Sequence, residues 1–254
     1  MSDTVLGFYD PLAEHYHLIF EDWDASIERQ ASVLHALLGS QLRDGPLKIL
    51  DCACGIGTQA LGFASRGHRV VASDLSPAAV ARAKREAESR GLEISSHVSD
   101  ITALAEIEER DFDVVAALDN ALPHLTREQV AAAVRAMGSK LRPGGLLLAS
   151  IRDYDALILQ RPAIQEPAFY GEAGRRRIVH QVWDWIDQER YTVHLYITVQ
   201  TNEGWKAHHF VAEYRCLLRD ELSTSLAEAG LHEIRWLMPS ESGFYQPIVV
   251  AKKN

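Results

Sequence analysis

Residues 48–60 read Lys48-Ile49-Leu50-Asp51-Cys52-Ala53-Cys54-Gly55-Ile56-Gly57-Thr58-Gln59-Ala60. The apolar residues before Asp51 are typical of a buried parallel strand, and a helical pattern begins at Thr58. Between them, the lack of side chains at Gly55 and Gly57 lets a ligand approach the backbone, and the helix start offers unpaired N–H groups. The stretch therefore predicts a strand, a glycine turn and a helix that together bind a ligand. The alternative is a turn whose glycines serve only packing.

Composition narrows the classes of function. The chain has 254 residues, of which 47% are hydrophobic, enough for a sizeable core. The net charge of −9 argues against sequence-independent binding to nucleic acid. The spacing of Cys52, Cys54 and Cys216 fits neither a zinc site nor a disulfide framework. No signal peptide or membrane span is visible in the sequence, so we expect a cytoplasmic protein without a membrane partner.

Strand and helix patterns alternate after the glycine turn. Further strands are expected at 68–74, 92–98, 111–118 and 146–151. This alternation predicts a right-handed, mostly parallel sheet, which binds ligands outside the carboxyl ends of its strands. Asp51, Asp74, Asp100 and the loop 118–124 all fall at such ends. Their coincidence makes a binding site far more plausible than a turn that serves packing alone.

The pattern changes after residue 151. Antiparallel strands that form a cap are expected over 178–186, 190–201 and 205–218. The segment around Pro162 and Pro167 is expected to be irregular. The predicted division of the chain is a helical lid segment at 1–44, a binding core at 45–151, the cap at 152–218, and a C-terminal helix and strands at 219–254 that complete the sheet.

The N-terminal segment is aromatic-rich over residues 8–20, and helical spacing follows at 25–38. Such a segment can cover the mouth of the ligand site as a lid. A plain packing arm is the equally plausible alternative.

The chain resembles the class I S-adenosylmethionine (SAM)-dependent methyltransferases, and within them the glycine N-methyltransferase and glycine-sarcosine methyltransferase group. Asp51–Gly57 carries the resemblance to the class, while 119–125 and 141–155 resemble the group, and 195–200 with Tyr214 extend the match across the cap. The resemblance implies a Rossmann-like α/β fold, in which a seven-stranded, mostly parallel sheet has an antiparallel β cap inserted after its fifth strand. It also implies SAM as the cofactor.

The resemblance implies roles for individual residues. The implied cofactor contacts are Tyr9, Arg29, Asp51, Ala53, Gly55, Gly57, Asp74, Leu75, Asp100, Ile101, Leu118 and His124. Arg29 would pair with the methionine carboxylate. Asp74 would hold the ribose; its alternative role is a helix cap, although Ser76 already supplies one. The implied acceptor contacts are Asn120, Arg152, Tyr170, Tyr196 and Tyr214, and the implied catalytic residues are His124, Asn120 and Arg152.

Two of these residues carry the predicted chemistry. His124 can act as a base near neutral pH, or it can orient its neighbours through hydrogen bonds. Arg152 can bind a carboxylate in bidentate fashion, or it can form a surface ion pair with Asp153 or Asp155. The tyrosines can surround the acceptor or can simply be strand core. The predicted acceptor is the amine of glycine or of a methylated glycine.

Three other functions stay open at this point. An O-methyltransferase of a small hydroxylated metabolite would keep the fold and cofactor. A nicotinamide oxidoreductase is disfavoured by Asp51 and by the resemblance of the cap, and a non-catalytic SAM-binding protein is disfavoured by the acceptor-side residues. We expect a small-molecule acceptor, a monomer or homodimer, no nucleic-acid partner, and no metal, since adjacent His208 and His209 on a strand point to opposite faces.

Overall fold

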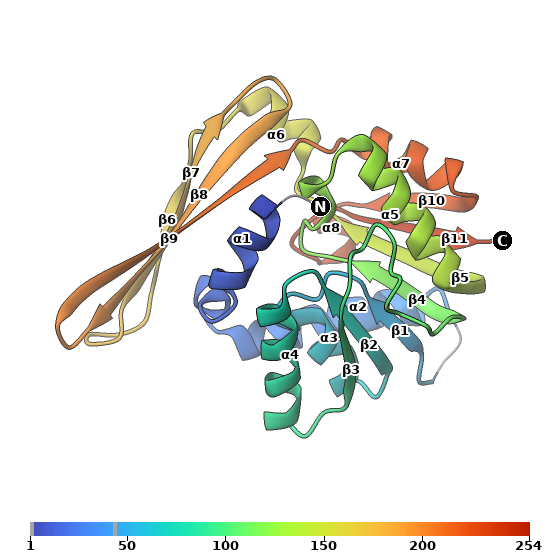
Figure 1. Ribbon diagram of the computed structural model, residues 1–254, viewed down its shortest axis with the longest axis horizontal. Helices are drawn as coiled ribbons and strands as arrows, with labels where there is room; N and C mark the ends of the chain where they lie inside the picture. The colour runs from blue at the N-terminus through green and yellow to red at the C-terminus, as the bar shows by residue number, and fades with distance from the viewer. Residues whose placement is uncertain (1–2, 43–44) are drawn as a thin grey trace.

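The computed structural model describes residues 3–42 and 45–254, and its main body is a seven-stranded sheet (Figure 1). Its strands are β1 (Lys48–Asp51), β2 (Arg69–Asp74), β3 (Ile94–Val98), β4 (Phe112–Ala117), β5 (Leu141–Ser150), β10 (Leu231–Leu237) and β11 (Ile248–Lys253). Their order is β10-β11-β5-β4-β1-β2-β3, and of these strands β11 alone runs in the opposite direction to the others. The predicted fold class is confirmed.

Helices cover both faces of this sheet. They are α1 (Asp3–Leu12), α2 (Trp23–Gly39), α3 (Thr58–Ser65), α4 (Pro77–Ser89), α5 (Arg127–Lys140), α6 (Tyr154–Gln160), α7 (Arg219–Glu228) and α8 (Pro239–Ser242), with short 3-10 helices η1 (Tyr16–Ile19) and η2 (Leu122–His124). Successive strand residues point to opposite faces. Ile49 of β1 accordingly belongs to the same core cluster as Phe63 of α3, whereas Leu50 belongs to the cluster that contains Val134 of α5. Strand β1, buried except at Lys48, thus lies between two helical layers.

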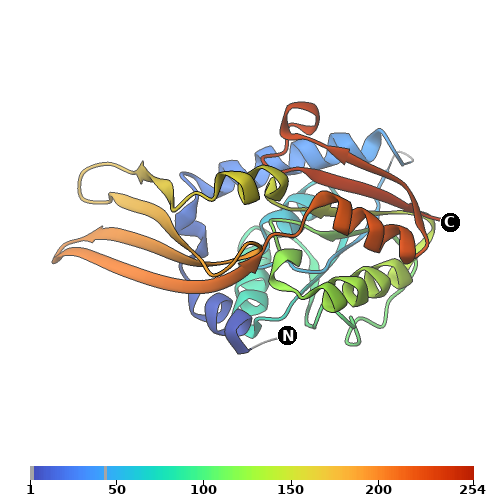
Figure 2. The same ribbon diagram turned by 90° about the horizontal axis from the view of Figure 1, so that it is seen from above.

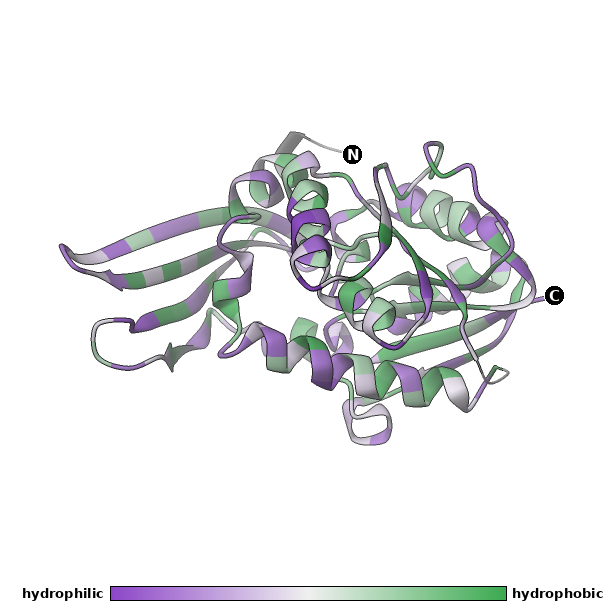
Figure 3. Ribbon diagram, turned by 90° about the horizontal axis from the view of Figure 1, so that it is seen from below, coloured by the Kyte–Doolittle hydropathy of each residue, from purple (hydrophilic) through white to green (hydrophobic). Residues whose placement is uncertain are grey.

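A second, antiparallel sheet projects from this body (Figures 1 and 2). Its strands, in spatial order, are β6 (Ile164–Tyr170), β7 (Arg177–Trp185), β8 (Arg190–Thr201) and β9 (Gly204–Arg215). Polar and apolar residues alternate along them (Figure 3), as the sequence pattern predicts. The prediction of an irregular segment around Pro162 and Pro167 is wrong in part, because Pro167 lies in strand β6. Pro167 is tolerated there because β6 is an edge strand whose register shifts between Gln165 and Ala168.

The N-terminal segment is fastened to the projecting sheet by Arg177. The guanidinium of this β7 residue donates to three carbonyl oxygens of the segment: to Leu18 at 2.9 Å from Nε, to Glu21 at 2.8 Å from Nη2, and to Phe20. It also lies 5.0 Å from the centre of the Tyr170 ring. Residues after α1 are therefore held against the sheet that follows much later in the sequence.

The pairing of β4 with β5 depends on Gly145. This glycine is needed for the space around it and not for its backbone conformation, because its φ is not positive. A Cβ atom at Gly145 would lie 2.9 Å from the Phe112 oxygen and 3.1 Å from the Asp113 oxygen, and neither backbone atom can rotate away. We expect Gly145→Ala to lower the free energy of unfolding by about 1–3 kcal/mol in urea titrations. Gly138→Ala in α5 is the matched control. No atom lies within 4 Å of its Cβ position, and alanine should stabilise that helix by up to about 1 kcal/mol. Equal stabilities of the two variants would contradict this account.

Candidate functional site

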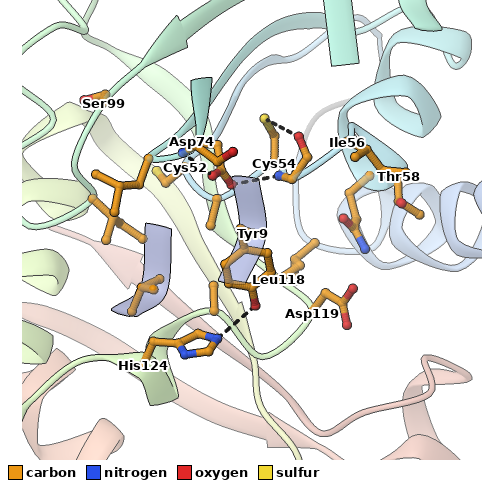
Figure 4. Close-up of a pocket in the computed structure, with 18 of the residues that line it drawn as sticks. Tyr9, Cys52, Cys54, Ile56, Thr58, Asp74, Ser99, Leu118, Asp119 and His124 are labelled. Carbon is orange, nitrogen blue, oxygen red and sulfur yellow. Dashed lines mark hydrogen bonds between the residues drawn. The ribbon is translucent and has the colours of Figure 1, made fainter. Parts of the chain in front are cut away.

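A cavity of ≈ 80 Å³ lies outside the carboxyl ends of β1 to β4, where α1 covers it (Figure 4). Loops after each of these strands supply its floor, and Val5, Leu6 and Tyr9 of α1 supply its cover. The predicted cofactor residues that line it are Tyr9, Ala53, Gly55, Asp74, Leu75, Ile101, Leu118 and His124. The structure thus brings most of the predicted cofactor residues to one place.

The two glycines of the turn have different roles. No atom lies within 4 Å of a Cβ built on Gly55, which lines the cavity with a φ of +52°. A Cβ on Gly57, in contrast, would lie 3.2 Å from the Cβ of Ala83 in α4. Gly57 does not line the cavity, so its missing side chain serves the packing of α3 against α4. The prediction that Gly57 contacts the cofactor is therefore wrong.

The structure does not support the role given to Arg29. This residue is exposed on α2, and it lines neither this cavity nor the one described below. Asp100 also lies outside the cavity lining, because its carboxylate accepts hydrogen bonds from the N–H and hydroxyl of Thr102 at 2.8 and 2.7 Å. Its neighbours Ser99 and Ile101 line the cavity instead.

Asp74 joins the first two loops. Its Oδ2 accepts from the N–H of Gly55 and its Oδ1 from the N–H of Ser76, both at 2.9 Å. The side chain that caps α4 belongs to Ser76, whose Oγ accepts from the N–H of Ala79 at 3.1 Å. Asp74 therefore faces the cavity and is not the helix cap.

Asp51, a predicted cofactor contact, does not line the cavity, although Cys52 and Ala53 after it do, and it is only 1% exposed. Within the described part of the chain, neither of its carboxylate oxygens makes a hydrogen bond of normal geometry. Burial raises its pKa to about 7, although the N–H of Ala53 opposes the rise and the charge of Asp74 adds to it. Buried polar atoms without a partner are rare in folded proteins, so Asp51 is suited to meet a cationic group of a ligand.

We expect Asp51→Asn to change how stability depends on pH. The folded protein binds a proton on Asp51 up to about pH 7, whereas the unfolded chain releases it near pH 4. The wild type should therefore lose about 2–3 kcal/mol of stability relative to the variant between pH 5 and pH 7.5. Urea unfolding of both proteins at the two pH values measures this difference. A constant difference would show that Asp51 keeps an ordinary pKa.

A second cavity, of ≈ 460 Å³, lies between the projecting sheet and the main body. Of the predicted acceptor residues, Asn120, Arg152, Tyr170 and Tyr214 line it. Tyr196 does not, which corrects its predicted role. Its ring stacks against those of His180 and His209, with centroids 4.9 and 4.4 Å away. Side chains alternate along β8, and Tyr196 alternates with the buried residues that face the body.

Arg152 presents an unpaired positive charge to the second cavity. Its guanidinium donates to the Tyr191 hydroxyl at 3.1 Å and to Gln181 Oε1 at 3.4 Å, and it lies 4.9 Å from the Trp183 ring centre. Within residues 3–42 and 45–254, no carboxylate forms an ion pair with it. The alternative of a surface ion pair is wrong, because Asp153 and Asp155 pair with Arg219.

His124 is held in one tautomer by its partners. Its Nδ1 lies 3.2 Å from the carbonyl oxygen of Glu213, which can only accept, so Nδ1 carries the hydrogen. Nε2 then accepts from the Tyr9 hydroxyl at 2.8 Å. Burial lowers the pKa of His124 to about 4, so the ring is neutral at pH 7. With both nitrogens occupied, the geometry favours the orienting role over that of a base.

The two cavities share a wall. Three of the described side chains, Tyr9, Tyr16 and Asp119, line both of them. Tyr16 and Asp119 have no role among the residues predicted from the sequence. Their only sequence signal is proximity, since Asp119 follows Leu118 at the end of β4 and Tyr16 lies in the aromatic N-terminal segment. In the described part of the chain, no group of three or more His, Cys, Asp or Glu side chains is placed to hold a metal, and no helix has the length and apolar character to cross a membrane.

Comparisons with known proteins agree with this architecture. Residues 49–145 match the family model of a methyltransferase domain. The chain is 41% identical over 104 residues to the ubiquinone biosynthesis O-methyltransferase of Methylocella silvestris, which covers 41% of this chain and 39% of that protein. It is 30% identical over 146 residues to the glycine/sarcosine N-methyltransferase of Parasynechococcus marenigrum, which covers 57% of this chain and 51% of that protein. The chain therefore spans about half or less of the length of these relatives.

The fold also matches a solved structure along nearly its whole length. The SAM-bound amino pentose methyltransferase of Micromonospora echinaspora superposes with a TM-score of 0.75 at 21% identity, covering 97% of this chain and 98% of that one. This likeness confirms the predicted fold, and the match of residues 49–145 to a methyltransferase domain confirms the resemblance predicted from the sequence over that segment.

Proposed function

We propose that this protein, whose residues 49–145 form a methyltransferase domain, transfers a methyl group from SAM to the amine of a small acceptor that carries a carboxylate, such as glycine or a methylated glycine. The observation that carries the proposal is Arg152, a half-buried arginine without an acidic partner in the described part of the chain, which faces a cavity next to the one that would hold SAM.

The residues of the first cavity suit SAM. Leu75 and Ile101 supply apolar walls for a flat ring, and Asp74 can accept from ribose hydroxyls. Asp51 does not line the cavity, but it directly precedes the lining residue Cys52, and its unpartnered carboxylate can meet an ammonium group. SAM supplies a methyl group that is already activated on a sulfonium. The volume of ≈ 80 Å³ lies below the roughly 300–1,000 Å³ of ligand sites, so the side chains of α1 must shift outward when the cofactor binds. This is the sense in which the N-terminal segment acts as a lid.

The second cavity would orient the acceptor. Arg152 can bind a carboxylate through two parallel hydrogen bonds, and its contacts with Tyr191 and Gln181 fix the guanidinium in advance. Asn120 holds the backbone of Arg152 in place, because the Oδ1 of Asn120 accepts a hydrogen bond from the N–H of Arg152 at 3.0 Å. The buried Nδ2 of Asn120, which lies near Tyr154, makes no hydrogen bond of normal geometry within the described residues, so this amide can donate to the acceptor.

A hydroxyl is the second candidate for the methylated group. The O-methyltransferase relative shares 41% identity over 104 residues of this chain, more than the N-methyltransferase relative does. Both candidates keep SAM and the fold, and they differ only in the group that the second cavity presents.

An assay of S-adenosylhomocysteine release tests the proposal with glycine, sarcosine, dimethylglycine, other small amines and hydroxylated acids. Turnover on carboxylate-bearing amines supports the N-methyltransferase, and turnover on hydroxylated acids alone supports the second candidate. A protein that does not bind SAM in equilibrium dialysis would contradict both. The cytoplasmic location, the lack of nucleic-acid and membrane partners, and the monomeric or dimeric state stay predictions from the sequence.

A further inference from the structure

The wall between the two cavities contains one carboxylate. Of its three side chains, Tyr9 and Tyr16 have pKa values raised well above 10 by burial, so both are neutral at pH 7. Asp119 alone can carry a charge there. It lines the first cavity together with His124 (Figure 4), and it lines the second together with Arg152. A methyl group that passes from one cavity to the other must pass this wall.

Asp119 lies in the wall between the cavities on a strained stretch of backbone. Asp119 and Asn120 have φ values of +58° and +65°, a left-handed conformation that is costly for two consecutive residues with side chains. Ser150 at the end of β5 holds both, because its Oγ accepts from the N–H of Asp119 at 2.8 Å and its carbonyl from the N–H of Asn120 at 3.2 Å. Gln246 in turn accepts from that Oγ at 2.9 Å.

Two neutral donors hold the Asp119 carboxylate. Oδ2 accepts from the Tyr16 hydroxyl at 2.9 Å, and Oδ1 accepts from the Tyr245 hydroxyl. Two carboxylate oxygens offer about four acceptor sites, so some are left for a ligand. Within residues 3–42 and 45–254, no Lys, Arg or His forms an ion pair with Asp119. Asp119 and Arg152 therefore present opposite charges, each without an ionic partner in this part of the chain, to the same cavity.

We propose that Asp119 binds the protonated amine of the acceptor and removes its proton, so that Asp119 and Arg152 together select a zwitterionic amino acid. This inference rests on the proposed function and names the acceptor class for it. In the step, an N–H bond of the ammonium breaks, the proton moves to a carboxylate oxygen of Asp119, and the electron pair stays on nitrogen as the lone pair that accepts a methyl group. The proton on Asp119 later leaves to water.

The surroundings of Asp119 agree with this role. Burial raises its pKa, which makes the carboxylate a better proton acceptor, while the hydroxyls of Tyr245 and Tyr16 and the charge of Arg152 oppose the rise. An ammonium brought out of water into this wall loses hydration and gains a charge-assisted hydrogen bond in its place.

Calorimetry of acceptor binding tests the inference without relying on turnover. Sarcosine and methoxyacetate have the same shape and carboxylate, but only sarcosine carries an ammonium. With S-adenosylhomocysteine present, the wild type should bind sarcosine roughly tenfold or more tightly than methoxyacetate. Asp119→Asn should remove this preference and leave the affinity for methoxyacetate within about twofold. Asp119→Gly provides the same comparison should the asparagine variant fold poorly, because glycine adopts a positive φ without strain.

Asp184→Asn is the charge-matched control. Asp184 lies on β7 with a 70% exposed side chain, and it lines neither cavity, so this variant should keep the wild-type preference for sarcosine. A preference that survives in both Asp119 variants would overturn the role of Asp119 and leave the proposed function standing. A wild type that binds the two probes equally, or binds neither, would overturn selection of a zwitterion. The assay with hydroxylated acids then decides the proposed function separately.

Discussion

Replacing Arg152 with alanine is expected to weaken the binding of a carboxylate-bearing acceptor roughly 100-fold and to change cofactor binding by less than about twofold. Arg152 lines the second cavity and not the first, and its guanidinium is pre-positioned by Tyr191 and Gln181. Removing it leaves the acceptor carboxylate buried without a partner. Separate calorimetric titrations with sarcosine and with S-adenosylhomocysteine measure the two effects.

Two variants control this experiment. Arg152→Lys keeps the charge but loses the planar pair of donors, so it should recover only part of the affinity. Arg161→Ala removes an exposed arginine that also lies over a tryptophan ring, 4.6 Å from the centre of Trp185, and that lines neither cavity. It should bind both ligands as the wild type does. An equal loss of acceptor and cofactor binding in Arg152→Ala would refute its assignment to the acceptor.

The second large effect is expected from a pair of substitutions in the glycine turn. Asparagine tolerates a left-handed backbone better than most residues do. At Gly55 its side chain would enter open space in the first cavity, so Gly55→Asn should weaken SAM binding roughly 100-fold or abolish it, while the protein remains folded. At Gly57 it would meet Ala83 and Leu61, so Gly57→Asn should lower the free energy of unfolding by about 2–3 kcal/mol.

Urea unfolding and SAM titration of both variants separate the two roles. We expect Gly55→Asn to lose SAM binding with little loss of stability, and Gly57→Asn to lose stability first. Loss of stability in Gly55→Asn, with loss of SAM binding but not of stability in Gly57→Asn, would contradict these assignments. Gly67→Asn, in the turn after α3 with a φ of +80° and no atom within 4 Å of its Cβ position, is a control for the backbone cost alone.

Much of the first cavity could be predicted because parallel strands place their carboxyl ends along one edge. Asp74, Leu75 and Ile101 follow strands whose apolar runs are clear in the sequence, so their convergence needs no knowledge of side-chain packing. The segment that matches a methyltransferase domain, residues 49–145, contains those same strand ends.

The remaining site depends on features that a linear pattern does not contain. Alternation along β8 separates Tyr196 from its neighbours but does not say which face meets the body. The role of Asp119 depends on two consecutive left-handed residues and on hydroxyl donors from both ends of the chain, Tyr16 and Tyr245. None of these contacts has a local sequence signature.

The shared wall limits how this protein can evolve toward a new acceptor. A substitution at Tyr9 or Tyr16 alters both cavities at once, so under the proposed function we expect a change of acceptor made there to alter cofactor affinity as well. Tyr170 and Gln181, on the projecting sheet, border only the acceptor cavity. Changes there leave the cofactor untouched. Acceptor preference should therefore diverge fastest on the projecting sheet, while the wall stays under the joint selection of two ligands.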